Sequence, residues 1–136
     1  MIDDVERWLI ESENDLDAAK ILLDANKYNI CAFHSQQSAE KALKALLILF
    51  QKNTWGHSII DLLAQVEDVM DIPDLEDLEK CARELDKHYI PSRYPDAYPS
   101  GAPKDYYDIE IAECVLNCAK KIRKFVKETM QRYTIG

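Results

Sequence analysis

Residues 30–52 read ICAFHSQQSAEKALKALLILFQK, and their apolar side chains recur at the spacing of an α-helix. At 100° per residue, Gln36 and Glu40 fall on the apolar face of this helix. Burying a glutamate is costly unless it is paired, so we expect Glu40 to have a partner or to line a cleft. The apolar residues that share this face are Ala32, Ala39, Leu43, Leu46, Leu47 and Phe50.

Four further segments show helical periodicity on either side of this stretch. Ser58, followed three residues later by Asp61, is typical of a capping box, and Pro73 ends the helix that it starts. No segment alternates with a period of two, and no hairpin signal occurs, so no strand is expected. The sequence therefore predicts an all-α, antiparallel bundle in a single domain over residues 1–136. The five predicted helices cover residues 3–25, 30–52, 58–72, 74–89 and 105–132.

Residues 88–104 interrupt the helical pattern and hold four of the five prolines of the chain. Proline fixes φ, lacks an N–H donor and pushes the preceding residue to extended geometry, so neither a helix nor an interior strand is expected here. Long loops in compact domains are more often functional or disordered than idle. Arg93 and three tyrosines suit an ordered, functional binding loop, whereas the alternative is a stiff connector whose tyrosines cover helix ends.

The composition is that of a globular protein, with 47% hydrophobic residues and a net charge of −8. No run of 18 apolar residues and no basic leader at the start occur, so a cytoplasmic protein is expected. The negative charge argues against broad nucleic-acid binding. Residues 120–132 nevertheless carry six bases and one acid. Two interpretations stay open: this basic helix is neutralised by acidic helices beside it, or it contacts nucleic acid.

No metal or cofactor site is expected from the sequence. The four cysteines form no Cys-x-x-Cys pair, and free thiols buried in helices are their default interpretation. No Glu-x-x-His pair is present, which disfavours a di-iron bundle. The three glycines lie too far apart to form a dinucleotide-binding or Walker loop.

Three segments together resemble the HEPN domain family. Residues 33–47 (FHSQQSAEKALKALL) match its Phe-His-x-Gln-Gln-x-x-Glu-Lys-x-x-Lys-x-x-Leu pattern. Residues 56–63 (GHSIIDLL) resemble the start of its third helix, and residues 89–97 (YIPSRYPDA) resemble its Tyr-Ile-Pro-x-Arg-Tyr-Pro-Asp/Asn-Ala loop. The chain is similar in particular to the subfamily that carries an Arg-Tyr-Pro-Asp loop and is associated with minimal nucleotidyltransferases.

This resemblance implies a bundle of four long helices plus a short helix, usually assembled as a homodimer. It also implies a nucleotide-binding or interaction module that partners a minimal nucleotidyltransferase in a toxin–antitoxin-type pair. Many relatives are RNase toxins whose motif is an arginine, four to six residues, and a histidine. Arg83 and His88 match that spacing, and a base with a cation would suit metal-independent cleavage by the 2′-OH.

Three functions stay open at this point. The first is a binding module, in which Arg93 would hold phosphate and tyrosine faces a base. The second is the RNase that uses Arg83 and His88, although His88 could simply pair with Glu84 one turn earlier. The third is a structural dimer subunit without a ligand. Separately, Arg93 could simply neutralise Glu40 and hold the loop against the bundle, which is compatible with a binding role. The candidate ligand-binding residues are Gln36, Glu40, Lys41, Arg93, Tyr94 and Asp96.

Overall fold

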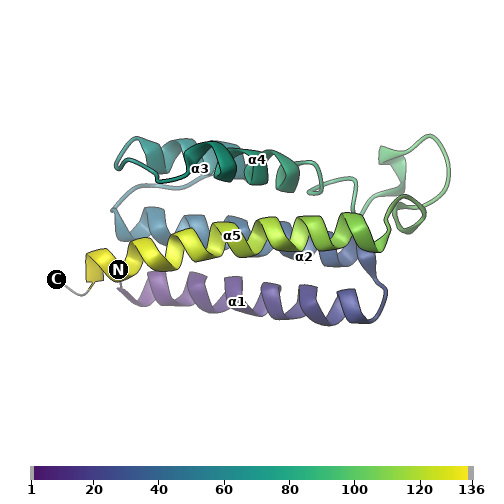
Figure 1. Cartoon of the computed structure of the whole chain (residues 1–136), viewed down its shortest axis with the longest axis horizontal. Coiled ribbons are helices and arrows are strands. Elements are labelled where there is room, and N and C mark those ends of the chain that lie inside the picture. Colours follow the sequence, from purple (N-terminus) through teal and green to yellow (C-terminus); the bar gives the residue numbers. More distant parts are fainter. Residues whose placement is uncertain (1, 135–136) are drawn as a thin grey trace.

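The computed structural model describes residues 2–134, and within that range it contains five α-helices and no strand. The predicted all-α bundle is confirmed. Two short 3-10 turns lie in the segment between the last two helices (Figure 1). The elements in chain order are α1 (Ile2–Asp24), α2 (Tyr28–Leu49), α3 (Ile59–Glu67), α4 (Leu75–Asp86), η1 (Pro95–Ala97), η2 (Pro103–Tyr106) and α5 (Ile109–Thr134).

The helices form an up-and-down bundle. Helices α2 and α5 lie in the middle, α1 packs on one side of them, and the shorter α3 and α4 pack on the other (Figure 1). A short turn after Asp24 sends the chain back, so α1 runs opposite to α2, and α4 runs opposite to α5 after the long proline-rich connection (Figure 1). In residues 2–134, no helix is long and apolar enough to cross a membrane.

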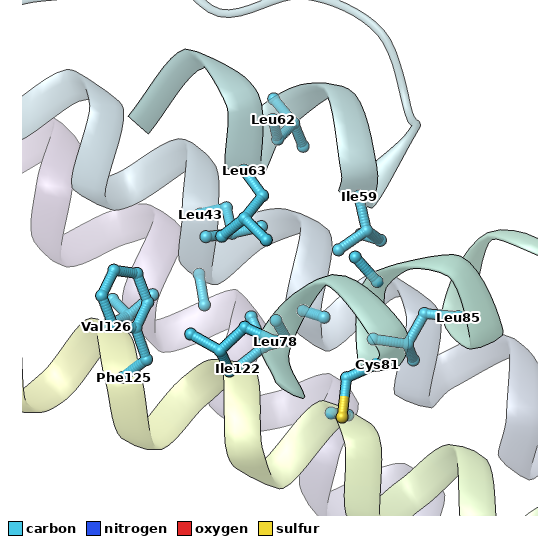
Figure 2. Packing of buried hydrophobic residues seen from close by; sticks show 14 of the residues in the cluster. Leu43, Ile59, Leu62, Leu63, Leu78, Cys81, Leu85, Ile122, Phe125 and Val126 are labelled. Atoms are coloured by element: carbon cyan, nitrogen blue, oxygen red, sulfur yellow. The ribbon is translucent and has the colours of Figure 1, made fainter. Parts of the chain in front are cut away.

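The core is built from the apolar stripes that the sequence predicts. Side chains from α2, α3, α4 and α5 meet in the part of the core between these helices, and each of them is almost fully buried (Figure 2). Each such leucine or isoleucine contributes about 1.5–3 kcal/mol relative to exposure. The interlocking residues include Leu43 of α2, Ile59 and Leu63 of α3, Leu78 and Leu85 of α4, and Ile122 and Val126 of α5.

Helix α3 begins at the predicted cap. The Ser58 hydroxyl accepts a hydrogen bond from the Asp61 backbone N–H at 3.2 Å. A second acceptor is not apparent from the sequence: the carboxylate of Asp86, at the end of α4, accepts from the backbone N–H groups of Ile59 and Ile60 at 2.6 and 3.1 Å. Because these donors have no partner within the helix, Asp86 joins the end of α4 to the start of α3.

Helix α4 ends three residues before the predicted limit at Tyr89. The prediction extended the apolar stripe to Tyr89, but Pro91 disfavours helical geometry at the residue before it, and a tighter turn takes over. The segment after α4 is nevertheless held in place. The side-chain amide of Asn29 donates to the Ser92 carbonyl at 3.0 Å, and the rings of Tyr98 and Tyr106 stack at 3.9 Å.

Candidate functional site

Side chains from three separate segments meet beside α2, and we call this group the Glu40–Arg93 cluster. The sequence predicts that the proline-rich loop lies next to the Gln36 and Glu40 face, and the structure brings the two together through His57 and Tyr89. Members come from α2, from the connection before α3 and from the segment after α4. They are Phe33, Gln36, Glu40, Lys44, His57, Tyr89, Arg93 and Tyr94.

Glu40 is the buried charge of this cluster, with only 4% of its surface exposed. Its carboxylate accepts from Lys44 Nζ at 3.0 Å and from Gln36 Nε2 at 3.3 Å, and His57 Nδ1 lies 3.2 Å away. The expectation of a partner for Glu40 is therefore confirmed. Burying a carboxylate is costly unless it is paired, and a lysine one turn along the same helix supplies the compensating charge.

Arg93 is held in a different way. Its Nε and Nη2 atoms donate to the Tyr89 carbonyl at 3.0 and 2.9 Å. Its guanidinium carbon lies 4.2 Å from the ring centre of Phe33, and 4.9 and 4.8 Å from those of Tyr89 and Tyr94. No carboxylate of residues 2–134 forms an ion pair with it. The alternative in which Arg93 neutralises Glu40 is wrong, because Lys44 forms the ion pair with Glu40 and His57 lies beside the same carboxylate.

The imidazole of His57 lies between the Glu40 carboxylate and the ring of Tyr89, against which Arg93 also packs. It stacks on Tyr89 with 4.7 Å between ring centres, while its Nδ1 faces Glu40. His57 and Tyr94 are both exposed, so they form the outer rim of the cluster. The site therefore offers an unneutralised guanidinium beside aromatic faces, a combination that suits phosphate and a planar base.

Two predicted site residues lie apart from this cluster. Lys41 Nζ donates to Asp15 of α1 at 2.6 Å, and His34 bonds to the other carboxylate oxygen at 2.9 Å. Burial raises the pKa of Asp15, but these hydrogen bonds outweigh it and hold the pKa below its ordinary value. Asp96 is exposed in η1. Lys41 and Asp96 stay candidates for ligand contact, but neither forms a hydrogen bond with Glu40 within residues 2–134.

His88, a predicted catalytic residue, is 8% exposed and bonded at both ring nitrogens. Nε2 lies 2.9 Å from Glu84, the alternative pair that the sequence suggested, and Nδ1 lies 2.7 Å from the Tyr107 hydroxyl. Burial acts against ionisation of Glu84, yet the hydrogen bonds from His88 and Lys87 hold its pKa below the ordinary value. An ionised Glu84 only accepts, so His88 donates through Nε2, and Nδ1 is left for Tyr107.

Arg83, the predicted partner of His88, is exposed on α4. No hydrogen bond or ion pair links the two side chains within residues 2–134. A catalytic role for this pair stays a prediction, since the imidazole that would accept a proton already has two partners. Tyr107 lies 19 positions away across the proline-rich segment, and no pattern in the sequence indicated its contact with His88.

Comparison with known proteins gives one consistent result. A model of the HEPN domain matches residues 5–129. The protein named "Putative toxin MJ1304" of Methanocaldococcus jannaschii is 33% identical over 131 residues, which span 91% of this chain and 86% of that protein.

Solved structures agree in both sequence and shape. TT1696 from Thermus thermophilus superposes with a TM-score of 0.86 at 42% identity, covering 91% of this chain and 96% of that one. ST0689, an archaeal HEPN homologue, gives a TM-score of 0.76 at 41% identity over 92% of this chain and 96% of that one. With most of its length matched on each count, the chain belongs to the HEPN domain family.

Proposed function

We propose that this HEPN domain is a nucleotide-binding and interaction module, and that the Glu40–Arg93 cluster is its ligand site. The observation that carries the proposal is the state of Arg93, a half-buried cation packed against three rings and bonded to a carbonyl and a tyrosine hydroxyl rather than to a carboxylate. Such a cation keeps its full charge for an anionic ligand. The exposed ring of Tyr94 gives a base a face to stack on.

The wider setting of the proposal is a toxin–antitoxin-type pair. The chain would act as a cytoplasmic homodimer whose partner is a minimal nucleotidyltransferase of the kind associated with the Arg-Tyr-Pro-Asp loop subfamily. Its similarity to a protein named as a toxin supports the toxin part of this setting. Co-expression with a minimal nucleotidyltransferase encoded beside it, followed by co-purification and sedimentation, tests both assemblies. Separate elution of the two chains, or a monomer in sedimentation, would count against them.

Calorimetry with ATP and GTP tests the ligand site directly. We expect the wild type to bind at least one of the two, and Arg93→Ala to weaken binding at least tenfold through loss of a charge-assisted contact. Arg7→Ala is the matched control, because Arg7 is an exposed arginine on α1 outside the cluster. Absence of heat with the wild type, or equal affinity in Arg93→Ala, would reject the site.

The RNase alternative needs a test suited to the geometry of α4. Purified protein would be incubated with RNA in the presence of a chelator, together with Arg83→Ala and His88→Ala. Arg83→Ala is the more informative variant, because its exposed side chain can be removed without disturbing packing. Cleavage by the wild type and its loss in Arg83→Ala would favour the enzyme. If the protein neither cleaves RNA nor binds nucleotides, the third function, a structural dimer subunit, is left.

A further inference from the structure

Helices α1 and α5 enclose a groove of about 430 Å³ whose lining is mainly cationic. None of its residues belongs to the Glu40–Arg93 cluster, so the groove is a second, separate feature. We call it the basic groove. Its cations are Lys20 of α1 and Lys120, Arg123, Lys124 and Lys127 of α5.

Only one of these five cations is neutralised inside the protein. Arg123 is 7% exposed, donates to Ser12 Oγ at 2.5 Å and forms an ion pair with Glu13, a groove carboxylate that is thereby occupied. The four lysines are exposed and form no hydrogen bond or ion pair with any residue of the described range 2–134. The idea that acidic helices neutralise the basic last helix thus applies to Arg123, and to Lys121 with Asp77, but not to these lysines.

The lysines are placed in line. Lys120, Lys124 and Lys127 follow each other at four and three residues, so they project along one face of α5 over about 10 Å. Lys20 adds a charge from the facing helix. The remaining carboxylate of the lining, Glu128, leaves a surplus of positive charge in the groove. A row of flexible ammonium groups matches an extended ligand with repeated negative charges.

The lining also indicates which polyanion fits. Protein interfaces depend on aromatic anchors in apolar pockets, but among the described residues that line the groove Leu16 is the only aliphatic one and none is aromatic. Base stacking needs aromatic faces as well, so bases are not read there. We propose that the basic groove binds the phosphodiester backbone of a nucleic-acid strand without selecting its sequence. The net charge of −8 does not prevent this, because charges beyond about 8 Å are largely screened at physiological salt.

Fluorescence anisotropy with a labelled 20-nucleotide RNA, and with DNA of the same sequence, tests the proposal. Four lysine–phosphate contacts predict an affinity that falls about 50-fold between 50 and 200 mM salt. We expect the triple variant Lys120→Gln/Lys124→Gln/Lys127→Gln to bind at least tenfold more weakly at 50 mM salt, with a shallower salt dependence. RNA and DNA should bind within a few-fold of each other, since only the backbone is contacted.

The matched control removes the same charge elsewhere. Lys52→Gln/Lys80→Gln/Lys104→Gln replaces three exposed lysines outside the groove, and we expect its affinity to stay within threefold of the wild type. Three outcomes would overturn the proposal: no binding at 50 mM salt, equal losses in both triple variants, or tighter binding of poly-glutamate than of either nucleic acid.

Discussion

Lysines and arginines serve two different purposes in the Glu40–Arg93 cluster and in the basic groove. In the cluster, Lys44 is buried against Glu40, and Arg93 is fixed by a carbonyl and three rings. In the groove, Lys120 and Lys124 extend into solvent without a partner in the described part of the chain. A buried charge such as Lys44 must be satisfied by the fold, so removal of its partner destabilises the protein, whereas exposed charges cost little and remain available to a ligand.

The largest expected effect is the loss of the enclosed carboxylate. Glu40→Ala would leave Lys44 buried without its counter-charge, which typically costs about 3–5 kcal/mol. Urea unfolding followed by circular dichroism measures the change in the free energy of unfolding. A cost below about 1 kcal/mol would show that water compensates Lys44 and that the cluster is not truly enclosed.

The double variant Glu40→Met/Lys44→Met is the control for this prediction. It removes both charges and fills the space with apolar groups, so we expect it to be clearly more stable than Glu40→Ala. If the double variant is as unstable as the single one, the loss arises from packing or from the contacts with His57 and Gln36 rather than from an unpaired lysine.

Asp86 gives the next largest effect, because its half-buried carboxylate caps a helix. Asp86→Ala would remove the acceptor of two backbone N–H groups and of the Ser58 hydroxyl, with an expected cost of about 2 kcal/mol. Asp68→Ala, at the other end of α3, is the matched control. Since a carboxylate at a helix C-terminus is unfavourable, that control should be neutral or slightly stabilising. Equal costs in the two variants would contradict the capping role.

The buried carboxylate of Asp15 should make the free energy of unfolding depend on pH. Its hydrogen bonds with His34 and Lys41 hold its pKa in the folded state below the ordinary value of 3.8. The stabilisation is therefore complete above that value and is lost as the pH falls through the lower, folded-state pKa. Unfolding free energies at pH 6 and pH 2.5 should differ less in Asp15→Asn than in the wild type. Asp17→Asn, an exposed neighbour, should keep the slope of the wild type; the same reduction there would refute the assignment.

The local parts of this architecture follow from the sequence, because they depend on residues close together in the chain. The apolar stripe of α2, the Ser58 cap and the Glu84–His88 pair were all readable at helical spacing. The need for a partner at Glu40 was also readable from its place on the apolar face. Lys44, four residues later, has the i, i+4 spacing at which side chains on a helix meet, so the partner of Glu40 lies within α2 rather than across the loop.

Contacts between distant segments were not readable. His57 stacks on Tyr89, and Asp86 caps α3, only because two short helices fold back beside α2. The sequence indicated that the loop and α2 lie together, but the Arg93–Glu40 pair that it left open as an alternative does not form, since charge alone does not distinguish a carboxylate from a set of rings. The sequence also does not show which cations of the basic helix are neutralised. Whether a lysine or arginine of α5 faces an acid depends on helix packing and not on composition.

The smallest expected effect belongs to the basic groove. Lys127→Gln removes an exposed charge that has no partner in residues 2–134, so its free energy of unfolding should stay within about 0.5 kcal/mol of the wild type. Arg123→Gln, one turn away, is the informative contrast, because it would break the bonds to Ser12 and Glu13 in a buried position. We expect it to cost at least about 2 kcal/mol more than Lys127→Gln. Urea unfolding of both variants under identical conditions measures the difference. Equal stabilities would mean that the buried Arg123 and the exposed Lys127 contribute equally to folding. The four lysines of the basic groove would then not differ from Arg123 in being free to bind a ligand.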